Sequence, residues 1–206
     1  MSFPFDEDFC LPTRSRVKRM AATMNILESV QKNYPAINNA AGEFLTKLTG
    51  VDIKKDIILA AEMAGLMLLR ASPANQKQIG PGTVVLGAVP DEQYQTMNHF
   101  VFSFAASNRL NPKEMDISAI PADAKNYLPE LTRFEKPFYE VCNKHGIENA
   151  LFPFTAAAAA GKLVLAGNEL KLLEPKVGLA ILVFHIIAGS KTFPYPVPAE
   201  YPQKSD

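Results

Sequence analysis

The stretch over residues 53–71 most restricts how this chain can fold. It reads IKKDIILAAEMAGLMLLRA and is apolar on nearly every side after Asp56. A helix that is hydrophobic all round is stable only where other structure surrounds it. Ser72 and Pro73 then end the pattern, because proline cannot continue a helix. We therefore expect residues 53–71 to form the central helix of a helical bundle.

Two further apolar stretches lie in the last third of the chain. Residues 150–166 contain the runs AAAAA and LVLA, residues 177–188 read VGLAILVFHIIA, and the segment GNELKLLEPK joins them. This arrangement predicts a helical hairpin. Each apolar run is shorter than the roughly 18 to 20 residues that cross a bilayer, and Lys162 interrupts the first. We therefore do not expect membrane insertion.

Apolar residues recur at steps of three and four in the segments 13–30, 37–50, 91–108 and 129–144. This spacing places them on one face of a helix and leaves the other face polar. We predict four amphipathic helices, the first two of which form an antiparallel pair. Pro137 lies inside the last of them and is expected to kink or split it.

The connecting segments are rich in proline and glycine. Residues 72–82 are predicted as a loop, 83–89 as a loop or an isolated strand, and 111–129 as a long loop or a few short helical turns. The tail 193–206 has prolines at alternating positions, so it is expected to be extended or disordered. The chain is thus predicted to be all-α, with one multi-helix bundle of about six to eight helices over residues 1–192.

Composition and charge exclude several classes of function. The 206 residues include 21 Lys and Arg and 21 Asp and Glu, so no net positive charge favours nucleic acid. Cys10 and Cys142 are too few and too far apart for a disulfide framework or a zinc motif. The first residues lack the basic and apolar regions of a secretory signal. We expect a soluble cytoplasmic protein.

Candidate reactive residues are the polar side chains inside apolar helices, namely Glu62, His99 and His185. A buried carboxylate or imidazole is costly unless it has a partner. Together the three side chains would supply a general acid and base, or bind a transition metal. Alternatively, each histidine donates to a backbone carbonyl, and Glu62 pairs with Arg70 or another cation.

Other motifs of enzymes and metal sites are missing. Gly80 and Gly82 fit neither phosphate-binding fingerprint, and no Gly-x-Ser-x-Gly or His-Glu-x-x-His sequence occurs. The paired Glu-x-x-His motifs of a di-iron bundle are also missing, so we expect no metal. Cys142 and His145 are spaced to face each other as nucleophile and base. Alternatively, Cys142 is a small core residue and His145 a cation at a helix end.

The sequence favours a non-enzymatic binding or protein-interaction protein, because it contains many apolar helices and no convergent set of reactive groups. Its ligand is then an apolar small molecule or a protein partner. The alternative is an enzyme with an acid/base or metal site built from Glu62 with His99, His185 or both. The sequence leaves both the cofactor and the oligomeric state open.

Overall fold

A computed structural model describes residues 24–48, 50, 52–72, 89–120 and 128–192. The beginning of the first predicted helix, most of the predicted extended segment 83–89 and the Pro-rich tail 193–206 lie outside the described residues. The described residues contain seven α-helices and no strand. The predicted all-α bundle is therefore confirmed.

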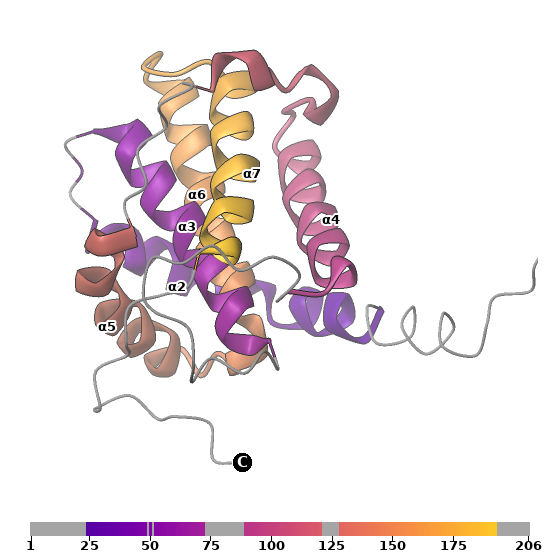
Figure 1. The fold of residues 1–206 in the computed structure, drawn as a ribbon, viewed down its shortest axis with the longest axis vertical. Coiled ribbons are helices and arrows are strands. Elements are labelled where there is room, and N and C mark those ends of the chain that lie inside the picture. The colour runs from indigo at the N-terminus through magenta and orange to yellow at the C-terminus, as the bar shows by residue number, and fades with distance from the viewer. Residues whose placement is uncertain (1–23, 49, 51, 73–88, 121–127, 193–206) are drawn as a thin grey trace, which may run out of the picture.

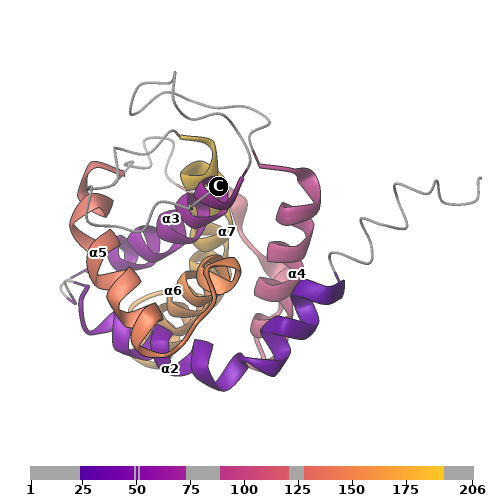
Figure 2. The same ribbon diagram turned by 90° about the horizontal axis from the view of Figure 1, so that it is seen from below.

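Three helices form the centre of the bundle: α3 (Ile53–Ala71), α6 (Phe152–Glu169) and α7 (Pro175–Lys191). Figure 2 shows them in the middle, with the other helices in an arc around them. Residues 59–69 of α3 are all buried, as are the first ten residues of α6. The prediction of a central helix over 53–71, followed by an apolar hairpin, is confirmed to within a few residues at each end.

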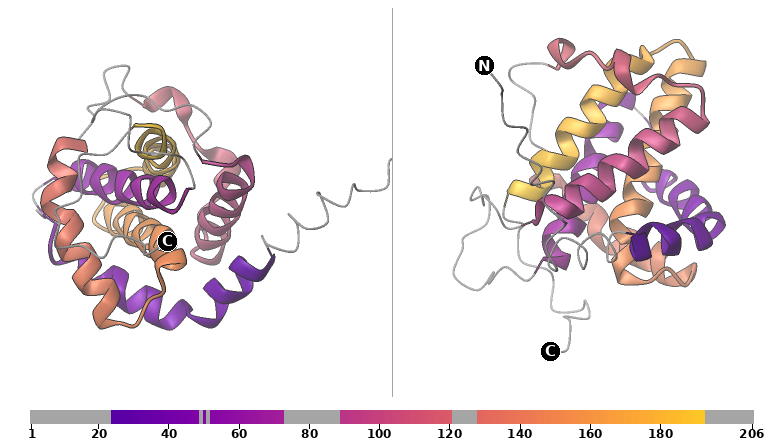
Figure 3. Two further views of the ribbon diagram at one scale, coloured as in Figure 1. Left: turned by 60° about the horizontal axis from the view of Figure 1, so that its bottom comes forward. Right: turned by 90° about the vertical axis from the view of Figure 1, so that its right-hand side faces the viewer.

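The outer arc consists of a helix over 24–32, α2 (Tyr34–Leu45), α4 (Asp91–Ser107) and α5 (Leu128–Lys144) (Figures 2 and 3). Each of these helices turns an apolar face toward the centre, as the three- and four-residue spacing predicts. Proline 137 is accommodated inside α5, which is one helix from end to end.

The antiparallel pairing predicted for the first two helices is wrong. Only Asn33 separates the helix over 24–32 from α2. The amide of Asn33 donates to the carbonyl of Ser29 at 3.0 Å, and the amide of Ile37 donates to the carbonyl of Asn33 at 3.0 Å. Helical hydrogen bonds thus continue on both sides of the junction, so the chain bends around the bundle without reversing.

Two glycines bring the backbones of α3 and α7 into contact. A Cβ atom at Gly65 would collide with the carbonyl oxygen of Ile186, and one at Gly189 would collide with the backbone of Glu62. Only glycine fits at these points, since the neighbouring atoms are backbone atoms that cannot turn aside. This close approach determines which side chains of the two helices face each other.

One helical stretch among the described residues, Asn149–Glu169, is long and apolar enough to cross a membrane by length and composition. It joins the short turn η4 (Asn149–Leu151) to α6 and has 21 residues, so the sequence-based estimate of its length was too short. Burial inside the bundle covers 72% of its apolar window. The central position of this stretch in the bundle explains its apolar character, since the core helices of soluble proteins are also long and apolar.

Candidate functional site

Two of the three predicted site residues lie together in the centre of the bundle. The Nδ1 atom of His185 on α7 and the Oε1 atom of Glu62 on α3 are 3.0 Å apart, the distance of a hydrogen bond from a ring N–H to a carboxylate. Their side chains are 3% and 1% exposed, respectively. The contact follows from the close approach of the two helices at Gly65 and Gly189.

The third residue, His99, does not join them, and the prediction that it lies inside an apolar helix is wrong. His99 is exposed. The buried residues of α4 include Met97, Phe100, Val101 and Phe104, so the helical period leaves residue 99 on the outer face. Because α4 belongs to the outer arc, a polar residue on that face meets solvent.

The sealed position of the Glu62–His185 pair limits its chemistry. A general acid or base must come within hydrogen-bond reach of a substrate atom. Neither residue lines the hollow of about 380 Å³ between the end of α4 and the start of α7, which is lined by Arg109, Leu110, Asn111, Glu114, Glu174, Pro175, Lys176 and Leu179. A buried, hydrogen-bonded pair that joins two central helices favours a structural role.

A second buried ion pair, which the sequence analysis missed, joins α3 to α5. The Nε and Nη2 atoms of Arg70 lie 2.6 and 3.1 Å from the two carboxylate oxygens of Glu135, whose side chain is 2% exposed. Arg70 therefore pairs with Glu135. The spacing contained a signal, since Glu135 stands four residues after Leu131 and three before Phe138, on the inward face of α5.

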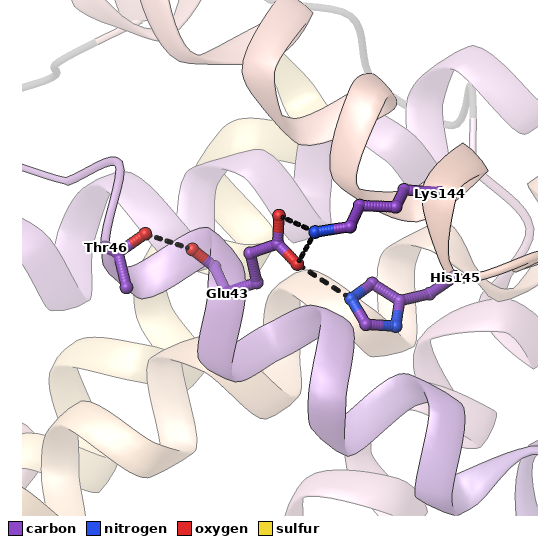
Figure 4. A network of polar contacts seen from close by, with 4 residues as sticks. All are labelled: Glu43, Thr46, Lys144 and His145. Atoms are coloured by element: carbon purple, nitrogen blue, oxygen red, sulfur yellow. Dashed lines mark hydrogen bonds and ion pairs between the residues drawn. The ribbon is translucent and has the colours of Figure 1, made fainter.

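A third polar cluster, on the surface, joins α2 to α5 (Figure 4). The Nζ atom of Lys144 donates to both carboxylate oxygens of Glu43 at 2.8 and 2.9 Å, and the Nε2 atom of His145 lies 2.9 Å from Oε2. Hydrogen bonds from Lys144 and then from His145 lower the pKa of Glu43. Because the pKa of Glu43 is lowered in the folded protein, its contacts with Lys144 and His145 stabilise the fold above the usual pKa of a glutamate. This stabilisation is lost as the pH falls through the lowered pKa of Glu43.

The proposed nucleophile Cys142 is fully buried, and burial raises the pKa of its thiol to about 12. A thiolate nucleophile needs the opposite shift. The neighbouring His145 contacts Glu43. Cys142 thus fits the alternative of a small core residue.

A different kind of site lies at the end of the bundle where α6 leads into α7. We call it the α6–α7 end and define it as residues 109–119 and 169–176, which include the short turns η2 (Pro112–Glu114) and η3 (Ile117–Ala119) at the top of Figure 1. Three of the most exposed large apolar side chains in the described part are here: Ile117 at 66%, Leu170 at 66% and Leu172 at 62%. Exposed apolar groups gathered in one region mark interaction surfaces.

Two basic residues at the α6–α7 end have an unusual backbone conformation. Arg109 and Lys171 have φ angles of 60° and 54°, in the left-handed region that glycine favours. Each follows a helix in the same motif, in which the next amide, of Leu110 or Leu172, donates to a carbonyl five residues back at 2.9 or 2.8 Å. A side chain in this conformation costs about 1 kcal/mol relative to glycine. Both helices thus end on a cation where glycine is the usual residue.

Comparison of the chain with protein-family models, curated protein sequences and solved structures finds no match. Among the described residues, no group of three His, Cys, Asp or Glu side chains is placed to hold a metal ion.

Proposed function

We propose that this chain is a non-enzymatic helical interaction protein that binds its partner through the α6–α7 end. The observation that carries the proposal is the presence of Ile117, Leu170 and Leu172 as projecting apolar side chains at that end. Their neighbour Leu173 is buried, so the connection between α6 and α7 is packed against the core through this one leucine. The exposed side chains are therefore in excess of what the local fold requires.

The polar groups at the centre of the bundle support the same proposal. Glu62, His185, Arg70 and Glu135 are partnered side chains that tie α3 to α7 and to α5. The contribution of these four side chains to the stability of the bundle is a sufficient explanation for their burial. A soluble cytoplasmic protein fits the mostly buried α6, the balanced charges and the small number of cysteines.

The test is the behaviour of the tagged chain in extracts of its own cells. Wild type is expected to sediment faster than the purified chain, because it is bound to a larger partner. Leu170→Ser/Leu172→Ser is expected to sediment at the position of the purified chain, since the apolar contacts are removed. Met24→Ser is the matched control, because Met24 is 58% exposed on the helix over 24–32, which lies at the opposite end of the bundle in Figure 1.

Circular dichroism of all three proteins establishes that the substitutions leave the fold intact. Equal sedimentation of wild type, the double variant and the purified chain would contradict the proposed function.

A further inference from the structure

We draw no further inference here: the strongest candidate, the hollow between the end of α4 and the start of α7, carries nothing because Asn111 and Lys176 already partner its two carboxylates, its other cation, Arg109, is exposed to solvent, and nothing in the structure shows what would fill it.

Discussion

Replacing Arg70 by alanine is expected to lower the free energy of unfolding by about 3–5 kcal/mol. The substitution leaves the carboxylate of Glu135, which is almost fully buried, without its two-point partner. An uncompensated buried charge is among the most destabilising defects in a protein core. Urea unfolding followed by circular dichroism measures the loss.

The same two helices provide a matched control. Lys55 of α3 and Glu130 of α5 form an ion pair of 2.7 Å whose side chains are partly exposed. Lys55→Ala should cost at most about 1 kcal/mol, because solvent weakens exposed pairs. The double variant Arg70→Met/Glu135→Met is expected to recover much of the Arg70→Ala loss, since it removes both charges. Equal effects of Arg70→Ala and Lys55→Ala would contradict the buried-pair account.

Replacing His185 by leucine is expected to cost about 3–5 kcal/mol, because it removes the imidazole that the buried carboxylate of Glu62 contacts between α3 and α7. Glu62→Gln should cost less, about 1–3 kcal/mol, since the amide keeps the shape and can still hydrogen-bond to the imidazole. The midpoints of urea unfolding of the two variants and wild type show which substitution destabilises the protein more.

A site residue would behave differently. Functional groups are often held at the expense of stability, so a conservative change at such a position leaves stability unchanged or raises it. A Glu62→Gln protein at least as stable as wild type would therefore count against the structural role of the pair.

The helices were predictable because local patterns determine them. The limits of α3 follow from Asp52, whose carboxylate accepts from the amides of Lys54 and Lys55 at 2.9 and 3.2 Å, and from Pro73 beyond its last turn. The path of the first helices was not predictable in the same way. Whether the junction at Asn33 reverses the chain or bends it depends on the bundle that both helices cover.

The site was predictable in part. Glu62 and His185 were identified because a polar side chain inside an apolar run needs a buried partner. That they pair with each other depends on Gly65 and Gly189, whose effect on helix distance appears only in three dimensions. His99 was assigned wrongly because the apolar residues Phe100, Val101 and Phe102 follow it directly in the sequence, and this run obscured the outer face of α4.

The contacts between Glu43 and the pair Lys144 and His145 join residues about half the chain apart, and no sequence pattern predicts them. The α6–α7 end was missed for a different reason. Leu170, Leu172 and Leu173 look alike in sequence, but only Leu173 enters the core. The left-handed conformation of Arg109 and Lys171 was also unpredictable, because glycine is the usual residue at that position.

The buried Glu62–His185 pair is expected to stabilise the bundle and to perform no chemistry on a substrate. The most direct measurement is modification of the histidines by diethylpyrocarbonate, followed by mass spectrometry of the peptides. In the folded protein the exposed His99 is expected to react and His185 to stay unmodified, and in urea both are expected to react. Modification of His185 in the folded protein at the rate of His99 would show that the pair is open to small molecules, and would contradict this expectation.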